Sequence, residues 1–532
     1  MNRRELLARL KKAVATDGLK TPGSQGSKDD GLDKIHVKFD LPHEHDSPSI
    51  AEKTDSKDHP EDLYPNGNRV SWDAEDDPEN PKNWSFWTKW LQICLLIVPV
   101  FTSSFGFTVM AGPAAEIMGT LRVHNSQLVT FAITAYTLGQ FFGQLIILPL
   151  HRKYGIRNVL LLHLVLFPTA NICCALSQDA GMLISFRFLS GLTSTFSFLL
   201  GYESSIEMFD AYAMGLGGGI LAISATIGTT VGLVSGSFLV ARLGWQWAFW
   251  ITAITSGGFG LPSVFLLRET SKKVLLTRKA IRLRKETFNQ ALYAEVATEK
   301  LTRLYQGVWD TYSQHLSKPS LVILYIHSAT FQGSIHLIYT TLGYVFLQQY
   351  SLAGSHISVA ATGIAVSITI SAFLLSPFTA SSSAWTIQTR ALYAKVIGSL
   401  MMATLCEVSG FITYGWTAEY HIDKILPILS LSLIPLGGQV SVSCPSPYFR
   451  CTIFVVDLVS KEPTRYIAHD TIRLLFCAVL PLGGIPLYRS IGVGWGNTLL
   501  GLLNLFLGVL VVAVFLRTVR AARPSVTGTP SG

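Results

Sequence analysis

Long apolar stretches of about 17–25 residues, separated by short polar loops, dominate the chain from residue 90 onwards. Each is long enough for a helix to cross roughly 30 Å of hydrocarbon. In lipid, isolated segments of this kind satisfy their backbone only as helices. The pattern predicts twelve spanning helices, at residues 90–111, 126–149, 158–177, 181–202, 215–240, 246–267, 321–346, 357–378, 391–414, 425–449, 470–488 and 497–516.

The polar stretches between these segments indicate how the chain is divided. Residues 1–88 are rich in charged residues, Ser, Pro and Gly, so we expect a disordered cytosolic tail. Residues 268–320 form a long cytosolic central loop, whose basic first part is expected to be helical. The remaining parts are two six-helix bundles and a cytosolic C-terminal tail, at residues 89–267, 321–516 and 517–532. The expected fold class is therefore an all-α membrane protein.

Composition and charge support this plan. Only 14% of the 532 residues are charged and 49% are hydrophobic, whereas soluble proteins have roughly 25% charged residues. The net charge of +8 comes from Lys and Arg that mostly flank the apolar segments, which argues against a nucleic-acid partner. These residues concentrate in the loops on one side, which predicts that both termini are cytosolic. We expect a monomer in the plasma membrane.

The sequence gives no indication of an enzyme, a metal site or a cofactor. The seven cysteines lie in or beside apolar segments and lack metal-ligand spacing. No phosphate-binding loop of the Gly-x4-Gly-Lys-Ser/Thr type is present, so ATP is not the expected energy source. The partners that we expect are a small-molecule substrate, protons and the lipid bilayer.

Several short motifs carry a family resemblance as a set. They are DPENPKNWS at 77–85, RFLSG at 187–191, GWQWAFW at 244–250, RET at 268–270 with AIRLRKET at 280–287, YGWTAE at 414–419, and GWGN at 494–497. Together they resemble the major facilitator superfamily and, within it, the fungal twelve-span drug:proton antiporters. The resemblance implies two six-helix bundles with a cavity lined by spans 1, 4, 7 and 10. It also implies efflux of drugs or secondary metabolites.

The chain departs from the family pattern at several sites, including the loop after the second segment and the antiporter motif. Arg152 stands where the family has an acid that helps to latch the inward-closed state. A like charge there removes the latch and adds repulsion. In the antiporter motif, Gly228, Gly232 and Gly236 are kept, and we expect them to form a tight helix–helix seam. Thr229 and Leu233 replace the motif's prolines.

Polar residues on two segments are the candidate substrate site. Arg187, Ser190 and Ser194 share one face of the fourth segment. Arg187 is either a fixed cation in a polar cavity wall or a structural arginine held by carbonyl groups. One face of the seventh segment carries the aromatic and hydrogen-bonding side chains of Tyr325, Gln332, His336 and Tyr339. Gln439 of the tenth segment is a further candidate.

Few groups are available to carry protons. Glu203 and Glu207 either relay protons or pair with basic residues of the inner loops. Glu407 lies deep in the ninth segment, and His336 either titrates near neutral pH or is hydrogen-bonded between helices. Asp457 and Arg473, at the inner ends of segments ten and eleven, are the expected gate pair.

The leading hypothesis is a secondary transporter that exports small, largely apolar organic molecules by proton antiport and alternating access. An uncoupled facilitator or importer is a second hypothesis, because the first segment contains no acid. A sensor or scaffold that does not transport is a third, because the Arg152 loop is altered.

Overall fold

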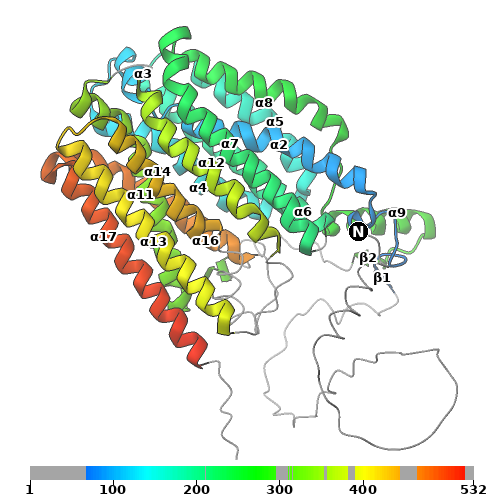
Figure 1. The fold of residues 1–532 in the computed structure, drawn as a ribbon. Coiled ribbons are helices and arrows are strands. Elements are labelled where there is room, and N and C mark those ends of the chain that lie inside the picture. Colours follow the sequence, from blue (N-terminus) through cyan, green and yellow to red (C-terminus); the bar gives the residue numbers. More distant parts are fainter. Residues whose placement is uncertain are drawn as a thin grey trace, which may run out of the picture. The chain divides into compact units, whose positions relative to one another are not determined.

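The computed structural model describes residues 68–209, 211–294, 309–310, 312–313, 316–352, 356–381, 390–443 and 464–521. All of these residues belong to one compact unit, Tyr64–Gly532. Within it, long helices lie side by side, with the early helices in blue to green and the late ones in yellow to red (Figure 1).

The helices that follow the tail form an N-terminal group. They are α2 (Phe86–Thr108), the short α3 (Ala114–Thr120), α4 (Ser126–Tyr154), α5 (Ile156–Ala175), α6 (Ala180–Met208), α7 (Ala211–Leu243) and α8 (Gln246–Leu266). A basic helix, α9 (Lys272–Thr287), follows where the central loop was expected to be helical. The C-terminal group contains α11 (Pro319–Tyr350), α12 (His356–Ser381), α13 (Arg390–Glu419), α14 (Ile425–Ser443), α16 (Thr464–Val479) and α17 (Gly484–Ala521).

The last two expected spans differ from the pattern read along the sequence. Residues 470–488 include most of α16, the 3₁₀ turn η5 (Leu480–Gly483) and the start of α17. Within α17, Gly492 has a φ of 85°, so the helix is kinked there. Glu419 accepts hydrogen bonds from the amides of Val493 (2.7 Å) and Gly494 (3.2 Å), which secures the turn beyond the kink.

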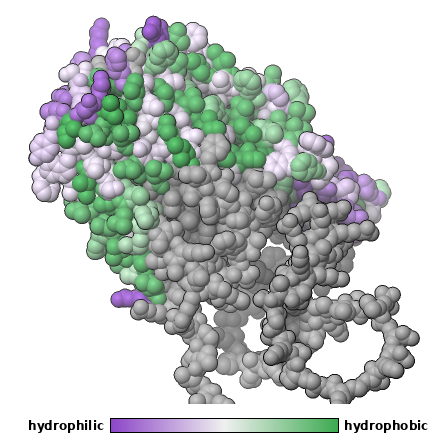
Figure 2. Space-filling model, in the orientation of Figure 1, coloured by the Kyte–Doolittle hydropathy of each residue, from purple (hydrophilic) through white to green (hydrophobic). Residues whose placement is uncertain are grey.

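Eight helical stretches in the described part of the chain are long and apolar enough to cross a membrane, as judged by length and composition. The prediction of a mainly helical membrane protein is therefore confirmed, while the count of twelve spans stays a prediction. The outer surface agrees, because large apolar side chains such as Trp87 (80% exposed) and Phe265 (79% exposed) face outwards. Figure 2 shows hydrophobic residues along the sides of the helices and hydrophilic ones near α3 and α9.

Short turns between helices depend on glycine at two positions. Gly155 joins α4 to α5 with a φ of 92°, and Gly244 joins α7 to α8 with the same φ. Both values lie in the left-handed region that residues with a Cβ rarely adopt. The starts of α2, α4 and α6 are capped by side chains, as where Asp179 accepts a hydrogen bond from the amide of Met182 at 2.8 Å. These signals fix where adjacent helices begin and end.

Two glycine seams hold the N-terminal group together. In α7, a Cβ at Gly228 or Gly236 would overlap the α2 backbone carbonyls. A Cβ at Gly232 would overlap the Thr108 hydroxyl of α2. A second seam joins α4 to α6, where Gly139, Gly143 and Gly191 each face the backbone of the other helix. Backbones that approach this closely leave no space for even a methyl group.

The segment before α2 is ordered, contrary to the disordered tail expected from its composition. β1 (Arg69–Val70) pairs in parallel with β2 (Tyr293–Ala294), and η3 (Pro81–Asn83) leads into α2. Val70 and Trp72 pack with apolar residues of α9 and β2. The expectation of disorder was wrong for residues 68–85, called the N-terminal strap below, because Lys279 and Arg282 of α9 pair with carboxylates of this segment.

Candidate functional site

A cavity of about 230 Å³ lies between helices of both groups. Its N-terminal wall comes from α2, α4, α6 and α7, and its C-terminal wall comes from α11, α12 and α16. The polar and aromatic residues that line it are Ser103, Ser104, Phe107, Gln140, Ser194, Thr195, Phe198, Thr226, Thr229, Gln332, His336, Tyr339, Asp470 and Arg473. Pockets that bury drug-sized ligands hold roughly 300–1,000 Å³. The cavity in this structure is smaller than that range.

The aromatic wall is formed where α2 meets α11. The ring of His336 stacks on Phe107 with 4.8 Å between ring centroids, and Tyr339 lies 5.7 Å from His336. Both α11 residues are more than nine-tenths buried. With Gln332, three of the four α11 residues that the sequence predicts at the substrate site therefore line the cavity. This contact also joins the N-terminal group to the C-terminal group.

The opposite wall is built from hydroxyl groups. Ser103 of α2 and Ser197 of α6 share a hydrogen bond of 2.9 Å, and the amide of Gln140 donates to Ser194 at 3.3 Å. Beside them, the hydroxyl of Thr108 donates to the Thr229 carbonyl at 3.0 Å. Ser194 thus lies in the lining as expected, among short polar side chains that offer hydrogen bonds without charge.

Arg187 lies outside the described cavity lining, with carbonyl groups around it as in the structural interpretation. Its guanidinium donates hydrogen bonds to the carbonyls of Gly106 (2.6 Å) and Phe107 (3.3 Å). It also lies over the ring of Tyr136, 4.6 Å from the centroid. The side chain is completely buried. These contacts fix the end of α2 against α6, so the positive charge faces protein carbonyls.

Two other expected substrate residues, Ser190 and Tyr325, do not line the described cavity. Ser190 accepts a hydrogen bond from the amide of Asn171 at 3.1 Å, inside the N-terminal group. Tyr325 packs against His469, with 5.5 Å between ring centroids. Gln439 lies in α14, but its side chain is outside the described residues. Helical periodicity placed these residues on a face without showing which neighbour covers that face.

The charged residues of the cavity belong to α16. Asp470 accepts hydrogen bonds from Arg473 Nε at 2.7 Å and from Gln144 Nε2 of α4 at 2.9 Å. Arg473 was expected to pair with Asp457, which lies outside the described residues. The sequence reasoning missed Asp470, although an acid three residues before an arginine on one helix is a recognisable ion-pair spacing.

The expected proton-carrying glutamates lie apart from the cavity lining. Glu203 and Glu207, near the end of α6, are half-buried and interact electrostatically with Arg152 and Lys272, respectively. Arg152 therefore has an acidic neighbour, which offsets the repulsion expected at this position. Glu407 of α13 is fully buried, and neither carboxylate oxygen has a hydrogen-bond partner among the described residues.

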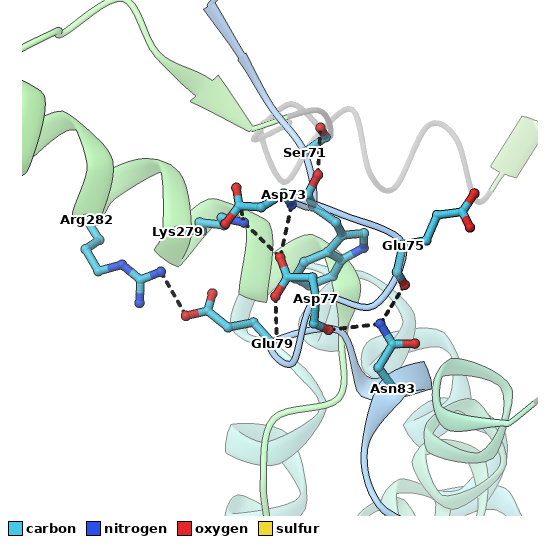
Figure 3. Close-up of polar contacts among 9 residues, drawn as sticks. Ser71, Asp73, Glu75, Asp77, Glu79, Asn83, Lys279 and Arg282 are labelled. Carbon is cyan, nitrogen blue, oxygen red and sulfur yellow. Dashed lines mark hydrogen bonds and ion pairs between the residues drawn. The ribbon is translucent and has the colours of Figure 1, made fainter.

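The N-terminal strap is held to α9 by a buried ion pair (Figure 3). The Lys279 ammonium lies 3.0 Å from the Asp77 carboxylate and 2.8 Å from that of Asp73. Burial alone would raise the pKa of Asp77, but hydrogen bonds from the Glu79 amide, Lys279 and the Asp73 amide lower it overall. Burial likewise opposes the charge of Lys279, yet the two carboxylates raise its pKa.

A larger hollow of about 440 Å³ lies between α12 and α14. Its walls are mostly aliphatic, with side chains such as Val359 (58% exposed) and Leu429 (58% exposed) on the outer surface. An apolar groove on the outside of a membrane protein faces lipid, and it brings few polar groups together. The smaller cavity between the two groups is therefore the better candidate site.

Comparison with known proteins gives long matches. The family described as Major Facilitator Superfamily matches residues 93–448. The MFS-type transporter penM of Penicillium rubens is 31% identical over 449 residues, covering 82% of this chain and 86% of the relative. The efflux pump radE of Floropilus chiversii is 28% identical over 463 residues, covering 84% and 82%. The MFS-type transporter hepF of Aspergillus oryzae is 26% identical, covering 90% and 96%.

Proposed function

Because this chain belongs to the major facilitator superfamily, a family of membrane transporters rather than enzymes, we propose that it exports small, largely apolar organic molecules. Drugs and fungal secondary metabolites are the substrate classes. The observation that carries the proposal is a cavity whose walls come from both helix groups. A site placed between two halves can open to one side and then to the other as the halves rock.

The chemistry of the cavity wall supports this substrate class. Phe107, His336 and Tyr339 offer aromatic faces, while Ser103, Ser194 and Gln332 offer hydrogen bonds. Ligands in such sites are held mainly by apolar contact, and a few polar groups fix their orientation. The Asp470–Arg473 pair supplies charges of both signs, so the lining favours no strongly charged substrate.

Proton antiport is the proposed energy source, with alternating access as the mechanism. The Asp470 carboxylate in the cavity lining supplies a titratable group where the substrate binds. We place both termini in the cytosol, because Lys and Arg concentrate in the corresponding loops. The proposed location is the plasma membrane and the proposed state is a monomer.

Efflux assays in yeast that lacks its own pumps test the proposal. The full chain is expressed and the cellular retention of a compound panel is measured with and without a protonophore. We expect protonophore-sensitive efflux of neutral, apolar compounds. Tyr339→Ala removes aromatic cavity surface and should weaken efflux strongly. Tyr420→Ala serves as the matched control, because Tyr420 is 69% exposed and is not among the lining residues.

Different outcomes separate the competing functions. Efflux that ignores the proton gradient would favour the uncoupled facilitator over the antiporter. No flux of any compound, with normal surface expression, would favour the sensor. Equal loss of efflux in Tyr339→Ala and Tyr420→Ala would mean that the cavity is not the substrate site.

A further inference from the structure

The carboxylate of Asp470 joins the two helix groups at the cavity. Among the described residues that line the cavity, Asp470 is the acidic residue and Arg473 is the basic residue that pairs with it. Asp470 is 6% exposed and Gln144 is 1% exposed, so water has little access to the bond between them. This bond of 2.9 Å connects α4 of the N-terminal group to α16 of the C-terminal group. A movement that separates α4 from α16 must break it.

The bond depends on the charge of Asp470. The Gln144 amide donates through Nε2, and its own oxygen has no hydrogen-bond partner among the described residues. Gln144 is therefore held in this state through the carboxylate. Hydrogen bonds to an ionised carboxylate are roughly twice as strong as those between neutral groups. Protonation of Asp470 weakens both its ion pair with Arg473 and its bond to Gln144.

Charged and hydrogen-bonding groups from several elements surround Asp470. On its own helix, Arg473 pairs with it, and His469 and Cys477 interact with it electrostatically. From outside the helix, Gln144 contacts it, the Tyr312 hydroxyl bonds to neighbouring Thr471, and His336 of α11 faces Arg473. The Asp470 carboxylate therefore lies between a cation of its own helix and an amide of α4.

We propose that Asp470 is the proton-carrying residue of transport, and that its ionised form locks α4 to α16 through Gln144. A proton that binds the carboxylate releases Gln144 and lets the two helices separate. Release of the proton restores the lock. The inference rests on the proposed function for its role in transport, whereas the lock itself is a property of the protein without substrate.

Hydrogen–deuterium exchange of the full chain in lipid nanodiscs tests the lock without a substrate. Exchange is measured at about pH 3 and about pH 8, on either side of the usual pKa of an aspartate side chain. Rates are corrected for the intrinsic effect of pH on amide exchange. In the wild type we expect α4 and α16 to exchange at least tenfold faster at the acid pH. Asp470→Asn should exchange fast at both values, because its side chain stays neutral.

Three further variants keep the test decisive. Gln144→Leu should also exchange fast at both pH values, and Gln127→Leu, an exposed glutamine on the same helix, should keep the wild-type difference. Asp470→Glu should keep a pH-dependent difference. If Asp470→Asn does not fold, Gln144→Leu decides. A wild-type pH response in either Asp470→Asn or Gln144→Leu would overturn the proposal.

A transport measurement then separates the lock from the proposed function. A neutral compound that the wild type expels from yeast is used as the probe in proteoliposomes. We expect Asp470→Asn to lose efflux driven by a pH gradient while it still exchanges the probe across the membrane. Full gradient-driven efflux by Asp470→Asn would refute the role of Asp470 as proton carrier. Absence of gradient-driven efflux in the wild type would instead refute the antiport proposal.

Discussion

Replacing Lys279 with methionine is expected to detach the N-terminal strap from α9. The ammonium is almost completely buried and lies within 3.0 Å of two carboxylates. Methionine has a similar length, so it fills the space of the aliphatic chain but leaves Asp77 without its cation. Asp77 is itself 5% exposed. Its carboxylate would therefore remain buried with only the backbone amides of Asp73 and Glu79 as donors.

The size of the effect follows from how much of the ion pair is buried. Removing one partner of a fully buried pair costs about 3–5 kcal/mol. The Asp77 carboxylate keeps its two amide hydrogen bonds, and the side chain of Asp73 is 81% exposed, so the loss falls at or below that range. We expect the strap to be less stable by about 2–3 kcal/mol. This corresponds to opening about thirtyfold to a hundredfold more often.

Hydrogen–deuterium exchange reports this opening directly. Amides of residues 69–85 and of β2 should exchange about thirtyfold to a hundredfold faster in Lys279→Met, since each 1.4 kcal/mol is a factor of ten. Amides in the core of α5 should not change. Lys285→Met is the matched control, because Lys285 lies on the same helix and is exposed.

Two results would refute the reasoning. Unchanged exchange in Lys279→Met would mean that the apolar contacts of Val70 and Trp72 hold the strap without the ion pair. An equal effect in Lys285→Met would mean that the overall charge of α9, rather than the buried contact, attracts the strap. Arg282→Met should have little effect, because its bridge to Glu79 is half exposed and ion pairs at the surface are weak.

Three further predictions test other parts of the fold. Gly236→Ala should lower the stability of the folded protein by about 1–3 kcal/mol, because the added methyl group overlaps the α2 backbone. Gly219→Ala is the control, because a methyl group there meets nothing within 4 Å. Equal melting temperatures of the two variants would contradict the glycine seam. Arg187→Met should reduce the amount of folded protein but leave the substrate range of any surviving protein unchanged, as compared in the efflux panel. The amides of the N-terminal strap should stay protected from hydrogen exchange between an acid pH limit and an alkaline pH limit. The lowered pKa of Asp77 means that its contribution is complete above 3.8 and is lost as pH falls through the lowered value. The raised pKa of Lys279 means that its contribution is complete below 10.5 and is lost as pH rises through the raised value. Exchange of the strap amides across this range measures both limits.

Much of the helical plan is readable from local sequence. Apolar runs long enough to cross a bilayer are local signals, and Gly155 and Gly244 mark turns that need a positive φ. The eleventh and twelfth segments were less readable, because the division depends on the proline-containing turn η5 and on the kink at Gly492. Both features lie inside one apolar stretch, so hydrophobicity alone does not locate them.

The candidate site was only partly readable for a physical reason. Periodicity groups residues on a helix face, as it did for Gln332, His336 and Tyr339, which line the cavity. It does not tell whether a face meets a cavity or another helix. Arg187 shows the difference, because the carbonyls that satisfy it come from α2, about 80 residues earlier in the chain.

By itself, the sequence determined that this protein is a helical membrane protein of the major facilitator superfamily. Transfer of apolar side chains into lipid and backbone hydrogen bonding within each helix are decided segment by segment. Only the tertiary structure decided which charges meet. The contacts of Asp470 with Gln144 and of Lys279 with Asp77 join residues more than 200 positions apart. Such contacts are created when helices pack, because burial then makes each polar group depend on its partner.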